Sequence, residues 1–158
     1  MERAEWLEAM KMDEYEWRLL VLCVFWWTAA VSDLRSKMIP IYLPVFFFAA
    51  AVVTNVCLPT SIDPKQLWTG AVPGGLLLLL SFVLKGKIGE GDGICLLAGG
   101  IWTGISYILI ILEGALVLVS LTGMILIAAR RGKADERIPF LPFLAGSASM
   151  IFLRELAG

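Results

Sequence analysis

The feature that most constrains this chain is a succession of apolar stretches, each about as long as a helix needs to cross a membrane. A helix crosses the hydrocarbon core of a bilayer with about 20 apolar residues. Hydrophobic residues make up 59% of the 158 residues and charged residues only 17%, so a soluble globule of this size would leave much apolar surface in water. The sequence therefore predicts an all-α, polytopic membrane helix bundle with six transmembrane helices. They lie approximately at residues 18–32, 39–58, 66–84, 94–112, 114–129 and 138–155.

Two boundaries of this predicted bundle need comment. Residues 1–17 carry six acidic side chains and do not resemble a signal peptide, which begins basic. We expect a solvated tail or a short interfacial helix there, followed by one six-span membrane domain at residues 18–158. The fourth and fifth spans run almost together, and we expect a tight turn at Glu113 and Gly114 to separate them.

The distribution of basic residues predicts how the bundle is oriented. The first, third and fifth connections hold eight of the 13 Lys and Arg residues, whereas the second and fourth hold only Lys65. Cytoplasmic loops of membrane proteins carry an excess of Lys and Arg. We therefore expect the odd-numbered connections in the cytoplasm and both termini outside.

Composition also excludes several kinds of chemistry. The chain has no histidine, which removes Ser-His-Asp triads, Cys-His dyads and histidine-ligated metals. Its three cysteines, Cys23, Cys57 and Cys95, form no C-x-x-C pair, so we expect no metal site. The net charge is −1 and no basic patch with interleaved aromatics occurs, so nucleic acid is not an expected partner.

Two aspartates lie at the boundary of predicted spans, where an ionisable group is costly and is a functional candidate by default. Asp33 follows the first span and Asp92 precedes the fourth. The chain crosses the membrane twice between them, so both carboxyl groups are expected at the same, cytoplasmic, face. Two carboxyl groups held close together cannot both ionise cheaply, so one keeps a proton. Such a pair can act as general base and general acid, as in aspartic proteases, without a metal or a cofactor.

The glycines around Asp92 fit such a site. Gly89, Gly91 and Gly93 permit positive φ and close approach of a substrate, and they would interrupt the helix before Asp92. A helix that begins after Asp92 would favour its ionised form, so we expect Asp92 to be the more acidic partner. The structural alternative is that Asp33 ends a helix and that Asp92 caps one.

Three segments of the chain resemble motifs of the type IV prepilin peptidases, which are aspartyl proteases of the Gly-x-Gly-Asp kind. The segment 33–40 looks like the family's D-x-x-x-x-x-I-P, and residues 89–92 match its G-x-G-D. Residues 137–145 are similar to the I-P-F-x-P-F-L-A segment that opens the family's last span. Positions within or beside these segments that we expect to support the site are Gly89, Gly91, Gly93, Lys37, Pro40 and Pro139.

The resemblance implies that Asp33 and Asp92 are catalytic, and that the substrate is the leader peptide of a pilin-like precursor, cut at the cytoplasmic face. It implies a multi-pass protein of the inner (cytoplasmic) membrane in a type IV pilus system. Family members that also methylate have an N-terminal region with paired cysteines, which these 158 residues lack, so we expect no S-adenosylmethionine requirement. Many members have lysine where this chain has Ile94. The short, peptidase-only members are the most similar.

Two other classes of function stay open on the sequence alone. One is a small membrane transporter or ion channel that uses boundary carboxylates, although no predicted span has a charged or broken site at its midplane. The other is a catalytically silent assembly factor. The sequence does not indicate the oligomeric state.

Overall fold

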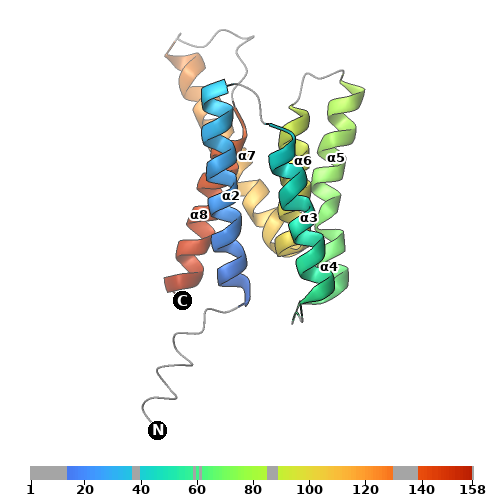
Figure 1. Cartoon of the computed structure of the whole chain (residues 1–158). Helices are drawn as coiled ribbons and strands as arrows, with labels where there is room; N and C mark the ends of the chain where they lie inside the picture. The colour runs from blue at the N-terminus through green and yellow to red at the C-terminus, as the bar shows by residue number, and fades with distance from the viewer. Residues whose placement is uncertain are drawn as a thin grey trace.

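A computed structural model describes residues 14–36, 40–58, 60, 62–84, 89–129 and 139–157 of the chain, and they are helical with short connections (Figure 1). No strand occurs in these ranges, which confirms the all-α prediction for them. The helices pack side by side as a bundle, and the start of α2 lies at the same end as the end of α8. The helices are α2 (Glu14–Ser36), α3 (Tyr42–Cys57), α4 (Pro64–Thr69), α5 (Ala71–Val83), α6 (Glu90–Thr103), α7 (Ile105–Ala128) and α8 (Leu141–Ala157).

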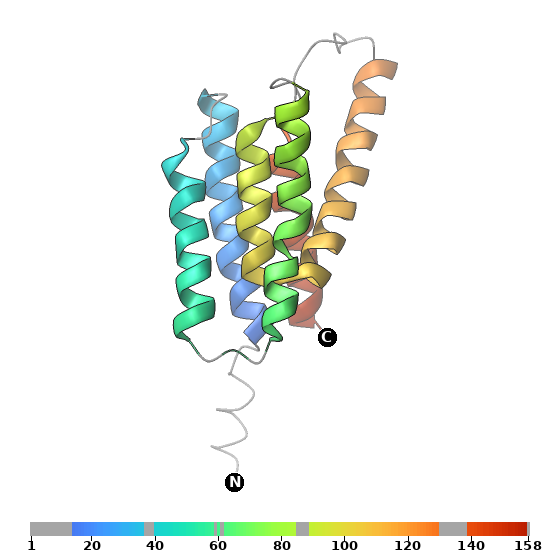
Figure 2. The same cartoon turned by 90° about the vertical axis from the view of Figure 1, so that its right-hand side faces the viewer.

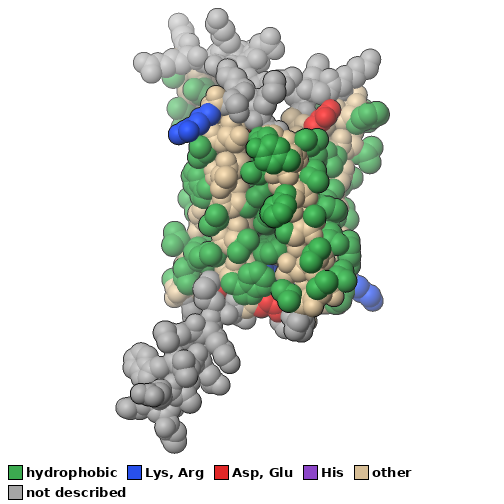
Figure 3. Space-filling view, in the orientation of Figure 1, with side chains coloured by type: hydrophobic (Ala, Val, Ile, Leu, Met, Phe, Trp, Pro, Cys, Tyr) green, Lys and Arg blue, Asp and Glu red, His purple; other side chains and the backbone are tan. Residues whose placement is uncertain are grey.

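The surface of the bundle is that of a membrane protein. Large apolar side chains such as Phe46, Phe82 and Ile127 are more than 70% exposed, and hydrophobic groups cover the flank of the molecule between its two ends (Figure 3). Within the described residues, three helices are long and apolar enough to cross a membrane: Glu14–Arg35, Pro64–Val83 and Ile105–Ala128. The second of these joins α4 and α5. The count of six spans and the side on which the termini lie stay predictions.

The expected turn at Glu113 and Gly114 is wrong. Both residues lie inside α7, and the chain instead turns at Gly104, between α6 and α7. Gly104 has a φ of +86°, a conformation that residues with a Cβ rarely adopt. Figure 2 shows that α7 first runs sideways from this turn and then rises toward the opposite end of the bundle. The boundary was misplaced because a charged residue inside an apolar run was taken for a membrane surface.

Helix α6 is the centre of the bundle and packs against five other helices. Its approach to the α4–α5 rod is close because glycines line both sides. A Cβ at Gly100 would lie 1.8 Å from the carbonyl oxygen of Gly70, and a Cβ at Gly74 would lie 2.2 Å from the amide nitrogen of Leu97. Small residues let membrane helices approach at backbone distance. With 14 residues, α6 is about 21 Å long.

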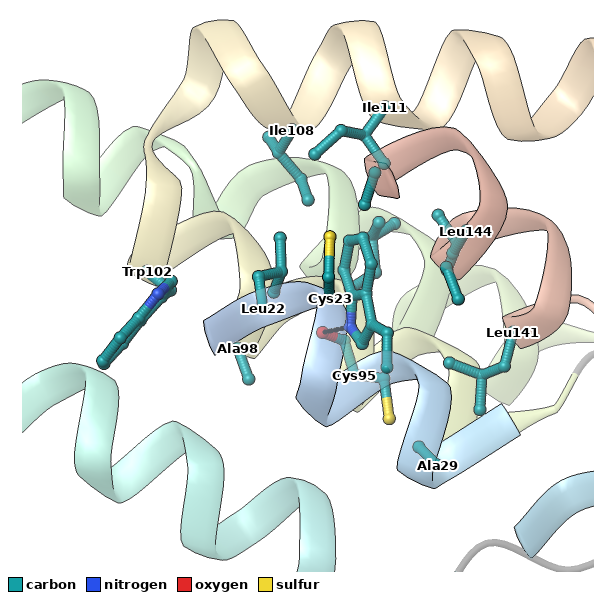
Figure 4. Packing of buried hydrophobic residues seen from close by; sticks show 14 of the residues in the cluster. Leu22, Cys23, Ala29, Cys95, Ala98, Trp102, Ile108, Ile111, Leu141 and Leu144 are labelled. Atoms are coloured by element: carbon teal, nitrogen blue, oxygen red, sulfur yellow. Dashed lines mark hydrogen bonds between the residues drawn. The ribbon is translucent and has the colours of Figure 1, made fainter. Parts of the chain in front are cut away.

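A tryptophan fixes α2 against α6. The Trp26 side chain is fully buried, and its Nε1 donates a hydrogen bond to the Cys95 carbonyl oxygen at 3.3 Å (dashed line in Figure 4). The same ring lies over Gly99, where a Cβ would be 2.5 Å from the Trp26 Cζ2 atom. The contact therefore sets both the spacing and the register of the two helices.

Candidate active site

Asp33 lies in the last turn of α2, on the face that packs into the bundle. It follows the buried residues Trp26 and Ala30 by seven and three positions, so the three share one side of the helix. Asp33 itself is only half-buried. The face of α2 that packs into the bundle therefore has the carboxyl group of Asp33 at its C-terminal end.

Asp92 lies in the first turn of α6 and continues the face that packs on α2. Asp33 comes seven residues after Trp26, and Asp92 comes seven residues before Gly99. Because α2 and α6 run in opposite directions and Trp26 contacts Gly99, equal steps along both helices bring the two aspartates to the same level. The packing of glycine and tryptophan thus positions the two carboxyl groups at one end of the bundle, where their charges interact.

The Asp92 carboxyl group, which precedes the predicted fourth span, resists ionisation. Burial, and secondarily the negative charge of Asp33, raise its pKa from 3.8 to about 6. The expectation that Asp92 is the more acidic partner, held ionised by the helix N-terminus, is therefore wrong in direction. Loss of solvation outweighs the helix dipole, which typically contributes less than about 1 kcal/mol.

The glycines near Asp92 act by their small size. Gly89 has a φ of −65° and directly precedes α6, while Gly91 and Gly93 lie inside the helix, so the expectation of positive φ is wrong for all three. Among the described glycines only Gly104 has positive φ. A Cβ at Gly89 would lie 2.7 Å from Asp92 Oδ2, so the carboxyl group folds back over this glycine. At Gly93 a Cβ would lie 2.7 Å from the side chain of Leu78 on α5.

The other supporting positions lie at the same end of the bundle or outside the described residues. Pro40 precedes α3, and its carbonyl oxygen accepts a 3.0 Å hydrogen bond from the Leu43 amide in the first turn of that helix. Pro139 precedes α8. Both prolines stand before a helix start, where a missing amide proton costs nothing. Lys37 lies outside the described residues.

A buried arginine at the opposite end of α6 escaped the sequence reasoning. Arg18 is 1% exposed, and its Nη1 donates to the Trp102 carbonyl oxygen at 2.6 Å and to Asn55 Oδ1 at 2.9 Å. The Asn55 amide in turn donates to the Ile101 carbonyl oxygen at 2.7 Å, and Arg18 pairs with Glu14 at 3.1 Å. These groups satisfy carbonyls at the C-terminus of α6, which the turn at Gly104 leaves without helical partners. The signal in the sequence was an arginine at the first position of an apolar run.

The site defines a class of protein before any comparison is made. It is a helical membrane protein in which two aspartates lie at one end of the bundle, and burial together with the charge of Asp33 raises the pKa of Asp92 to about 6. Within the described residues, no three His, Cys, Asp or Glu side chains gather as a metal site.

The comparison with protein families identifies the family. The model of the type IV leader peptidase family matches residues 20–128, which is more than half of the chain and includes both aspartates. The chain therefore belongs to the type IV leader peptidase family. The matched range ends before Pro139. Searches of curated proteins and of solved structures found no match.

Proposed function

We propose that this protein is a membrane-embedded aspartyl endopeptidase that removes the leader peptide from type IV pilin-like precursors at the cytoplasmic face. In this proposal the chain spans the inner membrane six times, and both termini lie outside. The substrate is a precursor whose apolar helix lies in the same bilayer, and neither a metal nor a cofactor takes part.

The observation that carries the proposal is the unequal environment of two adjacent carboxyl groups. The pKa of Asp92 is raised to about 6 by burial and by Asp33, so near neutral pH a proton is shared within the pair at little cost. A catalytic acid works best when its pKa lies near the operating pH. Membership of a leader peptidase family supplies the reaction class.

In the proposed mechanism Asp33 is the base and Asp92 is the acid. The ionised carboxylate of Asp33 takes a proton from a water molecule, whose oxygen attacks the carbonyl carbon of the scissile peptide bond. Protonated Asp92 donates its proton to the carbonyl oxygen, which gives a neutral tetrahedral diol. Collapse of the diol breaks the C–N bond, and Asp33 returns its proton to the leaving nitrogen while Asp92 recovers one from the hydroxyl group.

Co-expression with a pilin-like precursor from the same genome tests this function. We expect the wild type to convert the precursor to the shorter mature form, and Asp33→Asn and Asp92→Asn to leave it uncut. Glu90→Gln, which changes an exposed carboxylate in the same helical turn as Asp92, is the matched control and should process normally. Normal processing by either aspartate variant would remove that residue from the mechanism.

A further inference from the structure

A buried thiol lies one helical turn deeper in the bundle than Asp92, and the proposed mechanism does not use it. Cys95 follows Asp92 by three positions in α6, so the two side chains share one side of the helix. The Cys95 side chain is 0% exposed. Side chains in a helix lean toward its N-terminus, which in α6 is the end that carries Asp92. The thiol therefore lies between this aspartate and the interior of the bundle.

The matching positions on α2 are occupied by alanines. Trp26 on α2 contacts Gly99 on α6, and the two helices run in opposite directions. Three or four steps from this contact toward the aspartates lead to Ala29 and Ala30 on α2 and to Cys95 on α6. Both alanines are 0% exposed, and in Figure 4 the Cys95 sulfur atom points from α6 toward Ala29. We call these three side chains the floor of the site, and of the three only the thiol can form a hydrogen bond.

The thiol interacts with both aspartates. The negative charge of Asp92, and next that of Asp33, acts on the Cys95 side chain. The backbone of Cys95 is also held in place, because its carbonyl oxygen accepts the 3.3 Å hydrogen bond from Trp26 Nε1. Three other titratable side chains of the described helices lie at this end of the bundle, and all are exposed: Arg35, Tyr42 and Glu90.

A thiol suits this position because it is a weak hydrogen-bond donor. A strong donor next to a carboxyl group stabilises the ionised form and lowers the pKa of that group. A water molecule in the floor would act in the same way, but it needs space and several polar partners, which two alanines and a thiol do not provide. The sulfur atom therefore fills the space below the aspartates without favouring the loss of their protons.

We propose that Cys95 is a positioning residue of the aspartate pair: its thiol closes the floor beneath both carboxyl groups without donating a strong hydrogen bond, so that Asp92 retains the proton that it transfers. The catalytic consequence rests on the proposed function, whereas the effect on Asp92 can be measured without a substrate. Cys23 is the matched control. It is also buried, but its side chain is hydrogen-bonded to Ser149 on α8.

Carboxyl-carbon NMR titration of the protein in detergent measures the effect on Asp92. Cys95→Ser places a hydroxyl group where the thiol stands, and we expect the pKa of Asp92 to fall by about one, a tenfold loss of proton affinity. Cys95→Ala adds no donor and should leave this pKa at about 6, as should Cys23→Ser. An unchanged pKa in Cys95→Ser, or an equal fall in Cys95→Ala or Cys23→Ser, would overturn the proposal.

Infrared spectroscopy tests the same contact in the wild type, so it does not depend on whether Cys95→Ser folds. The S–H stretching band of a cysteine lies apart from other protein bands and responds to a charge beside it. We expect the difference spectrum between pH 5 and pH 7, on either side of the Asp92 pKa of about 6, to contain a change in this band. The change should disappear in Cys95→Ala and in Asp92→Asn and persist in Cys23→Ala. A wild-type spectrum without it would contradict the placement of the thiol.

Peptidase assays connect the floor to catalysis. The pH dependence of kcat/KM reports the pKa values of the free enzyme, so Cys95→Ser should move its alkaline limb by about one toward lower pH. Relative to the wild type, kcat/KM should fall nearly tenfold at pH 7 and largely recover at pH 5. A loss of the same size at every pH would reduce Cys95 to a structural role. A wild type that cuts no precursor would refute the proposed function instead, and the NMR result would still decide the effect on Asp92.

Discussion

Replacement of Asp92 by asparagine should abolish peptidase activity and at the same time stabilise the fold. The carboxyl group of Asp92 is partly buried, and this burial together with the charge of Asp33 raises its pKa from 3.8 to about 6. A raised pKa means that the folded state binds more protons than the unfolded state between these values. The wild type therefore loses stability as pH rises from about 4 to about 6.

The size of this effect follows from the pKa. A rise from 3.8 to about 6 corresponds to about 3 kcal/mol between the two protonation states. Asparagine keeps the shape of the side chain but cannot ionise. We therefore expect Asp92→Asn and the wild type to be equally stable near pH 3.5, and the variant to be more stable by about 3 kcal/mol above pH 6. For a chain of this length, 3 kcal/mol corresponds to about 6–12 °C in melting temperature.

Thermal unfolding in detergent between pH 3.5 and 8 measures the difference. Glu90→Gln is the control, since it removes an exposed carboxylate two residues away and should change the melting temperature little at any pH. A gap between Asp92→Asn and the wild type that is the same at pH 4 and at pH 7.5 would refute the reasoning. The side chain would then not occupy the desolvated position that the packing of α2 and α6 gives it.

Three further predictions test the elements that hold the site. Asp33→Asn should lower the pKa of Asp92 without returning it to 3.8, because burial is the larger cause of the increase. Carboxyl-carbon NMR titration would detect this change. An unchanged pKa would mean that the two carboxyl groups are too far apart to interact. Gly100→Ala should destabilise the bundle by about 1–3 kcal/mol or more, because α5 and α6 must separate to admit the methyl group. Gly123 has open space around it, so Gly123→Ala should stabilise the bundle by about 0.5–1 kcal/mol in the same unfolding assay. Arg18→Ala should lower the free energy of unfolding by about 3–5 kcal/mol, because the α6 carbonyls and Glu14 lose their partner. Arg154 is exposed, and Arg154→Ala should lower it by less than about 0.5 kcal/mol. Similar losses for both variants would contradict the role of Arg18.

Helix class and the pairing of the aspartates were accessible from the sequence because both follow from rules that act along the chain. Apolar runs separated by basic connections predict helices, and two crossings between Asp33 and Asp92 return the chain to the same end. The match to the type IV leader peptidase family agrees with the resemblance inferred from the short motifs around these two residues.

The features that sequence reasoning missed depend on contacts between helices. The position of the turn between α6 and α7 is set by Gly104, whose positive φ has no signature beyond the glycine itself. The direction of the pKa change at Asp92 depends on how deeply the bundle buries the carboxyl group, and no local sequence pattern reports burial. Arg18 stands at the first position of the first predicted span, and only the contacts with Asn55 and the carbonyl of Trp102 show that it lies inside the bundle.

The length of α6 bears on where the hydrolytic water comes from. A rod of about 21 Å cannot reach both faces of a hydrocarbon layer about 30 Å thick, so at least one of its ends is sunk below the lipid headgroups. Arg18 and its hydrogen-bond partners occupy the C-terminal end of α6, so in the proposed mechanism water must reach the end that carries Asp92. In the proposed orientation, a central helix this short would leave a local dip in the cytoplasmic surface of the membrane, and bulk water would reach the scissile bond through it.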